Sequence, residues 1–170
     1  MVLLVIDTQN LIVTETLYAF DSFVKNVADL LCAARKSGTE VIFVRHSDEE
    51  LAPGTPGFDI YPAFSPKPGE KIFDKHFNSA FRETGLAEYL LAEGQTELMT
   101  VGLQTDYCID ATVKSGFERG FRMIVPAFCN TTEDNDFLTG ESSYRYYNEQ
   151  MWRDRYASCI SLEDAKNLLS

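Results

Sequence analysis

Residues 97–120 read ELMTVGLQTDYCIDATVKSGFERG, a short apolar run followed by a segment with helical spacing. The run at 97–102 is nearly continuous rather than alternating, which is typical of a strand covered on both faces of its sheet. The segment at 106–119 is followed by Gly120, and a glycine in this position commonly ends a helix. The stretch therefore predicts a strand followed by a helix, which is the repeating unit of an α/β protein.

The same unit recurs along the whole chain. Further apolar runs lie at residues 2–6, 40–44, 71–74, 122–125 and 157–160, and further helix candidates lie at 20–37, 81–93, 142–153 and 162–169. This alternation predicts a three-layer αβα architecture whose central sheet is mainly parallel, six-stranded and Rossmann-like. Because no linker, repeat or low-complexity segment divides residues 1–170, we expect a single domain.

The composition argues against several kinds of partner. Lys and Arg total 15 against 26 Asp and Glu, so the formal charge of −11 lacks the basic footprint of a nucleic-acid-binding protein. The N-terminal run is apolar only through Ile6 and has no basic flank or cleavage site, so it predicts a buried strand. We expect a cytoplasmic protein with no nucleic-acid or membrane partner. The four cysteines lack zinc-finger spacing and are expected to be free thiols: Cys32, Cys108, Cys129 and Cys159.

Two long irregular stretches follow predicted strands. Residues 46–70 hold five of the six prolines and follow the second strand, and residues 126–141 follow the fifth. Long loops in compact domains are commonly functional, and open α/β sheets place their sites at the carboxyl ends of strands. We therefore expect the functional site at that edge of the sheet.

Three chemically active residues fall at strand ends. Asp7 ends the first strand, Lys75 ends the third, and Cys108 follows the fourth. Burying an unpaired charge is costly, so polar residues are rarely placed at the ends of buried strands without a role. Three of them at neighbouring strand ends therefore predict a functional site. Taken singly, each residue has a structural alternative: Asp7 caps a turn, Lys75 extends to solvent, and Cys108 fills the core.

The position of Cys108 favours a nucleophile. If Thr105 or Asp106 is the N-cap, Cys108 lies in the first helical turn, where free amides and the helix dipole favour a thiolate. Lys75 nearby is expected to lower the thiol pKa further. Asp7 within hydrogen-bond reach accepts the thiol proton and later delivers it to a leaving nitrogen. The three residues predict an amide-cleaving set.

Five motifs carry a family resemblance: VIDTQN, GTPGFDIYP, KHFNSAFRETGL, VGLQTDYCIDATVKSGFERGF and YYNEQMW. In order and spacing they resemble the isochorismatase-like cysteine hydrolases, a superfamily that includes nicotinamidases and N-carbamoylsarcosine amidohydrolases. The resemblance implies the strand order 3-2-1-4-5-6 and places Asp7, Lys75 and Cys108 at the catalytic positions. It also implies a cis peptide bond between Leu103 and Gln104, with the amides of Gln104 and Cys108 forming the oxyanion hole.

One departure from the superfamily concerns metal. Nicotinamidases that resemble this chain bind a divalent metal through an Asp-x-His pair after the second strand and a further histidine in the next loop. This chain reads VRHSDEE there, with His46 and Asp48 in reversed order and no second histidine in the loop. We expect no metal, and the alternative is a divalent metal held by His46, Asp48 and Glu50. His46 is otherwise expected in the pocket wall or as a hydrogen-bonding residue.

The remaining candidates are pocket residues. Side chains near the strand ends are expected to contact substrate: Gln9, Ile12, His46, Tyr61, Phe77, Tyr107 and Phe128. For Gln9 the alternative is capping of the turn, and for the apolar residues it is the core. The late aromatic cluster is expected to cover the sheet or to form a subunit contact, as homo-oligomers are common in the superfamily: Tyr144, Tyr146, Tyr147 and Trp152.

The resemblance thus implies a cysteine-dependent hydrolase of a small molecule's non-peptide C–N bond, acting through a thioester and without an organic cofactor. Two alternatives remain. Relatives that hydrolyse the vinyl ether of isochorismate use the Asp and Lys but lack the cysteine, so the presence of Cys108 disfavours that chemistry. A non-catalytic binding member of the fold is the second alternative.

Overall fold

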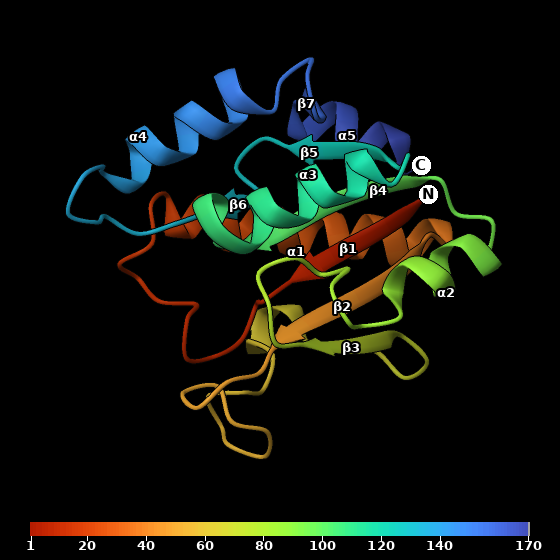
Figure 1. Ribbon diagram of the computed structural model, residues 1–170, viewed down its shortest axis with the longest axis horizontal. Coiled ribbons are helices and arrows are strands. Elements are labelled where there is room, and N and C mark those ends of the chain that lie inside the picture. Colours follow the sequence, from red (N-terminus) through yellow and green to blue (C-terminus); the bar gives the residue numbers. More distant parts are fainter. Residues whose placement is uncertain (170) are drawn as a thin grey trace.

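The computed structural model describes residues 1–169, which form a parallel sheet with helices on both faces (Figure 1). The strands are β1 (Val2–Ile6), β2 (Glu40–His46), β3 (Lys71–Lys75), β4 (Glu97–Leu103), β5 (Arg122–Pro126), β6 (Asn130–Thr131) and β7 (Ser158–Ile160). Their order is β3-β2-β1-β4-β5-β7, with β6 paired to β4, and every ladder is parallel. The predicted fold class and strand order are confirmed, the sixth predicted strand being β7. The sequence analysis missed β6, because a two-residue strand inside a long loop has no periodicity to detect.

The helices differ from prediction mainly at their starts. They are α1 (Phe20–Ser37), α2 (Leu86–Ala92), α3 (Asp110–Glu118), α4 (Gly140–Arg145) and α5 (Leu162–Leu168), with a 3₁₀ turn η1 (Pro62–Phe64) and two π-helical turns, η2 (Thr105–Ile109) and η3 (Tyr146–Met151). α1 matches its prediction. The prediction that α2 begins at residue 81 was wrong, because Glu83 and Gly85 adopt positive φ angles of 57° and 75° that no right-handed helix contains. The segments predicted at 106–119 and 142–153 each divide into an α-helix and a π-helical turn.

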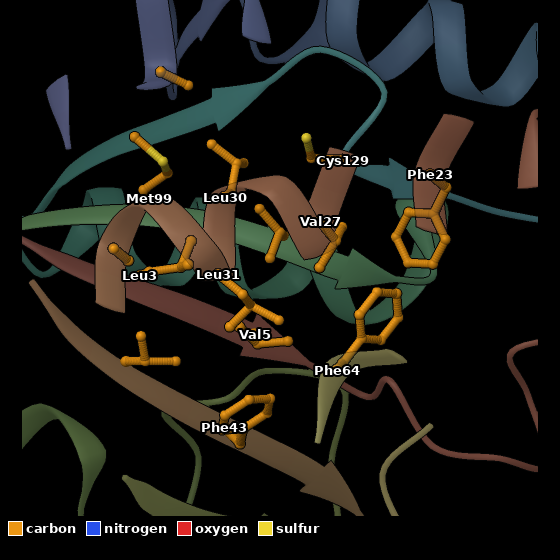
Figure 2. Close-up of a cluster of buried hydrophobic side chains, with 14 of the residues drawn as sticks. Leu3, Val5, Phe23, Val27, Leu30, Leu31, Phe43, Phe64, Met99 and Cys129 are labelled. Carbon is orange, nitrogen blue, oxygen red and sulfur yellow. The ribbon is translucent and has the colours of Figure 1, made fainter. Parts of the chain in front are cut away.

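The two faces of the sheet carry separate apolar cores. On one face, α1 packs Phe23, Val27, Leu30 and Leu31 against side chains of β1, β2 and β4 (Figure 2). α2, α3 and Trp152 cover the other face. All five residues of β1 are 0% exposed, which explains the unbroken apolar run at the N-terminus. Each such aliphatic side chain contributes about 1.5–3 kcal/mol on burial.

Close contact between β1 and β4 brings two site segments together. Gly102 in β4 has a φ of 125°, and a Cβ atom at this position would lie 2.0 Å from the carbonyl oxygen of Ile6. Only glycine permits this approach. Immediately after Ile6, Asp7 leaves the strand with a φ of 51°. The end of β1 and the segment after β4 therefore lie side by side.

The carboxyl ends of the strands lie on one side of the sheet, and the two long irregular segments leave from that side (Figure 1). This is where open parallel sheets place their sites. Within residues 1–169, no helix combines the length and the apolar character needed to cross a bilayer.

Candidate active site

The ammonium group of Lys75 organises the site at this edge. Its Nζ lies 2.7 Å from Asp7 Oδ2, 3.0 Å from His46 Nδ1 and 3.2 Å from Cys108 Sγ. The side chains of Lys75 and Asp7 are 0% and 2% exposed. An ammonium group has three hydrogens to donate, and the three neighbours supply three acceptors. The structure therefore brings the predicted residues Asp7, Lys75 and Cys108 together around one buried cation.

Cys108 lies in the first helical turn, as predicted, but this turn is the π-helical η2 rather than α-helical. The N-cap of this turn is Gln104 rather than Thr105 or Asp106. Burial raises the pKa of the Cys108 thiol to about 12; the Asp7 carboxylate adds to the rise, and Lys75 only partly opposes it. The expectation of a depressed thiol pKa was therefore wrong. A thiol with a raised pKa would need a proton acceptor to act as a nucleophile.

Asp7 can be that acceptor. Burial raises the pKa of its carboxyl group, against the opposing effect of Lys75, so Asp7 is a stronger base than an exposed aspartate. Oδ2 is paired with Lys75, whereas Oδ1 is buried with no hydrogen-bond partner among the residues that the structure describes. A carboxylate oxygen of Asp7 lies within 4.8 Å of Cys108 Sγ. The free oxygen is thus available to a proton.

Two residues of the alternative metal site, His46 and Asp48, are engaged by other groups of the protein. His46 directs Nδ1 to Lys75 and Nε2 to Asp48 Oδ2, at 3.2 Å, so both ring nitrogens are engaged. The backbone amides of Glu50 and Leu51 donate to Asp48 Oδ1, and the exposed Glu50 is not among the clustered ligand groups in residues 1–169. The only such cluster there is Asp7, His46 and Cys108, and the Lys75 ammonium already contacts all three. The residues present do not fit the divalent metal of the nicotinamidases.

Gln9 holds the end of β2 in place. It is 0% exposed, its Nε2 donates to the carbonyl oxygen of His46 at 3.0 Å, and its Oε1 accepts the His46 amide at 2.8 Å. Both ends of this amide side chain are thus used within the protein. Gln9 acts on the site by fixing the His46 backbone, and the structure offers no polar atom of it to a substrate.

The other predicted pocket residues lie on several segments around the strand ends. Tyr107 follows Asp106 in η2 and is half-exposed, and Phe128 follows β5, stacked on Tyr144 with ring centroids 5.1 Å apart. Phe77 follows β3 and lies under the guanidinium of Arg82. Ile12 and Tyr61 pack partly buried against the α1 face of the sheet. Of these five, Tyr107 and Phe77 belong to the segments that carry Cys108 and Lys75.

The candidate oxyanion donors lie at and next to Cys108. The peptide bond between Leu103 and Gln104 is cis. The carbonyl oxygen of Gln104 accepts the amides of Tyr107 and Ile109, each at 3.1 Å, and so ties residue 104 to the turn that carries Cys108. The amides of Gln104 and Cys108 therefore belong to one compact loop, and their role as oxyanion donors stays a prediction.

Sequence reasoning missed two groups of polar residues. Asn78 Oδ1 lies 3.9 Å from Cys108 Sγ, and Asn78 is exposed beside the thiol. Thr105 of η2 donates to Asn130, which is hydrogen-bonded to Asn148 of η3. The motif KHFNSAF contains Asn78 only three residues after Lys75, and this spacing was the available signal. Nothing local in the sequence connects Asn130 with Asn148.

The remaining cysteines and late aromatics have mixed outcomes. All three are free thiols, as expected: Cys32 is exposed, Cys129 is buried and Cys159 is partly buried. Trp152 is 0% exposed and donates to Asp110 at 2.8 Å, which agrees with covering the sheet. Tyr144 is also buried, and Tyr147 packs partly buried against Trp152, but Tyr146 is 46% exposed.

Comparisons with known proteins identify what the chain is similar to. The Isochorismatase domain family matches residues 1–148. The streptothricin hydrolase of Streptomyces noursei is 31% identical over 137 residues, covering 78% of this chain and 54% of that protein. The maleamate amidohydrolase of Pseudomonas putida is 31% identical over 124 residues, covering 62% of this chain and 58% of that protein. The chain thus spans little more than half the length of these two relatives.

A solved structure extends the likeness over the whole fold. The crystal structure of an isochorismatase-family protein from Chromobacterium violaceum superposes with a TM-score of 0.91 at 27% identity. The match covers 99% of this chain and 92% of that one.

Proposed function

The chain belongs to the isochorismatase family, and we propose that it hydrolyses a non-peptide C–N bond of a small molecule, of the amide or ureide type, through a thioester on Cys108. One observation carries the proposal: a fully buried ammonium group contacts both a carboxylate and a thiol, Asp7 at 2.7 Å and Cys108 at 3.2 Å. The names of the streptothricin hydrolase and the maleamate amidohydrolase support hydrolysis, and the latter supports an amide.

The chemical steps follow from these positions. Cys108 Sγ attacks the substrate carbonyl carbon while its proton passes to Asp7 Oδ1. The amides of Gln104 and Cys108 hold the resulting oxyanion. Asp7 returns the proton to the departing nitrogen, leaving a thioester. Water then gives a proton to Asp7 and attacks the thioester, and Asp7 returns this proton to the Cys108 sulfur as the acid product leaves.

The raised thiol pKa agrees with this order of events. At rest the site holds one carboxylate, one ammonium and a neutral thiol, so its charges cancel. When the proton moves to Asp7, the negative charge moves to the oxyanion and the total charge stays zero. No step of the reaction therefore leaves an uncompensated charge in the buried site. Lys75 stabilises the anion, first on Asp7 and then near the sulfur.

Vinyl-ether hydrolysis is the second candidate, because it uses the same Asp and Lys. A nucleophilic cysteine has no role in it, yet Cys108 lies in contact with Lys75. Cytoplasmic location and homo-oligomerisation stay predictions. The exposed side chains of Tyr146 and Phe137 are compatible with a subunit contact.

The proposal is tested by trapping the intermediate. When the chain is incubated with a panel of amides and ureides, active substrates are expected to release ammonia or an amine. Acid quenching during turnover should leave a protein whose intact mass has increased by the acyl group, and peptide mapping should place the group on Cys108. Turnover with the adduct on another residue, or an active vinyl ether with no adduct, would contradict the proposal.

Activity is expected to survive metal removal. Both ring nitrogens of His46 are engaged, and the Lys75 ammonium lies between the clustered ligand groups of Asp7, His46 and Cys108. Dialysis against a chelator should therefore leave kcat/KM on a panel substrate unchanged within about twofold. The rate is measured before and after dialysis, with residual metal determined in the same samples. A loss that zinc or iron restores would reinstate a metal site.

A further inference from the structure

His46 lies next to the proposed catalytic residues Asp7, Lys75 and Cys108, and the proposed chemical steps give its side chain no role. Its side chain is 18% exposed and reaches the site from the end of β2, between β1 and β3. The titratable groups that face it are Lys75, Asp7, Cys108 and Asp48. Of these, Lys75 and Asp48 are in hydrogen-bond contact with the ring.

The contacts of the ring define its tautomer. Lys75 can only donate, so His46 Nδ1, at 3.0 Å, must be the acceptor and carry no hydrogen. The hydrogen then lies on Nε2, which donates to Asp48 Oδ2 at 3.2 Å. Burial and the neighbouring Lys75 lower the pKa of His46, in agreement with a neutral ring.

The Asp48 carboxylate is itself held in place. Its Oδ1 accepts the backbone amides of Leu51 at 2.7 Å and Glu50 at 2.9 Å, and these bonds lower its pKa. On the other side, Gln9 fixes the backbone of His46. A loop carboxylate, a histidine and the Lys75 ammonium thus form a continuous chain of hydrogen bonds from the surface to the thiol.

We propose that His46 and Asp48 are positioning residues: neutral His46 accepts the third hydrogen of the Lys75 ammonium and Asp48 fixes the tautomer in which it can do so. A buried N–H without an acceptor is costly, and within residues 1–169 the acceptors in contact with Lys75 Nζ are Asp7, Cys108 and His46. Without His46, one hydrogen of the Lys75 ammonium would lack this acceptor, and the group would turn away from the thiol. The inference depends on the proposed function in one respect only, which is that Lys75 is a catalytic residue.

The first test is the tautomer itself. The chain has two histidines, His46 and His76, so ¹⁵N spectra of the imidazoles are simple to assign with a His76→Asn variant. At neutral pH we expect His46 to be neutral with its hydrogen on Nε2. A hydrogen on Nδ1, or a doubly protonated ring, would overturn the proposal, because neither form can accept from Lys75.

The second test compares two substitutions of similar size. His46→Asn keeps an acceptor close to the position of Nδ1, whereas His46→Leu removes it. At mildly alkaline pH, the rate constant for alkylation of Cys108 should fall about tenfold in His46→Leu, as for a rise of one unit in the thiol pKa, and stay within about twofold in His46→Asn. Peptide mapping separates Cys108 from the exposed Cys32.

Equal rates in both variants would overturn the proposal, whether both fall or neither does. Should His46→Leu not fold, Asp48→Asn changes only an exposed side chain and is expected to slow alkylation in the same direction. Neither readout uses a substrate. A substrate panel that shows no turnover therefore refutes the proposed function alone, whereas an Nδ1 hydrogen refutes this inference alone.

Discussion

Replacing Cys108 with serine is expected to lower turnover of an amide substrate by at least about 10³-fold and to abolish the acyl adduct. The Cys108 thiol already has a pKa raised to about 12, and a hydroxyl group in the same place is still harder to deprotonate. Asp7 is a carboxylate and cannot make up this difference. Steady-state kinetics and intact-protein mass spectrometry after acid quenching measure both effects.

The matched control is Cys32→Ser. Cys32 is an exposed thiol on α1 that lies outside the site, so this variant should retain wild-type turnover and the adduct. Near-full activity in Cys108→Ser would remove the nucleophile from the mechanism. If Asp7→Asn were inactive at the same time, the chemistry would be acid catalysis, and vinyl-ether hydrolysis would replace our proposal.

Asp7→Asn is expected to lower turnover by about 10²–10⁴-fold, the usual contribution of a general acid–base group. The amide keeps the shape of the side chain and can still accept from Lys75. It cannot take the thiol proton, so attack and departure of the leaving nitrogen both fail. The adduct should therefore not accumulate either, and thermal unfolding measured alongside the kinetics shows whether the fold persists.

Asp74→Asn serves as the control for Asp7→Asn. Asp74 lies next to Lys75 in β3, but its carboxylate pairs with Arg45 at 2.8 Å and is 43% exposed. Loss of this surface ion pair should leave turnover unchanged within about twofold. A comparable loss of activity in both variants would show that charge near β3, rather than the Asp7 proton acceptor, governs the rate.

The fold was predictable because its main signals are local. A strand buried on both faces, such as β1, is a continuous apolar run, and α1 ends with a basic turn and Gly38. The start of α2 was not predictable, because Glu83 and Gly85 adopt left-handed conformations that depend on their tertiary setting. The same holds for β6, whose two residues become a strand only by pairing with β4.

The meeting of Asp7, Lys75 and Cys108 was predictable for a topological reason. Carboxyl ends of parallel strands converge, so Asp7, Lys75 and Cys108 had to approach one another once the sheet was assigned. The protonation state of the thiol was not predictable, because burial outweighs the effect of Lys75 and sequence alone does not give burial. The partner of His46 was missed for the same reason: Lys75 reaches it from the neighbouring strand, 29 residues away.

The buried ion pair between Asp7 and Lys75 bears on how this protein can be engineered. Two charges removed from water often cost more free energy than their attraction returns, and apolar side chains of similar volume are often more stable in such places. Selecting a variant library for heat resistance alone would therefore enrich apolar replacements at these two positions, and under the proposed mechanism such proteins would be stable but inactive. Libraries should leave both positions unchanged and vary exposed apolar residues instead, such as Leu91 and Phe137, which are 65% and 93% exposed.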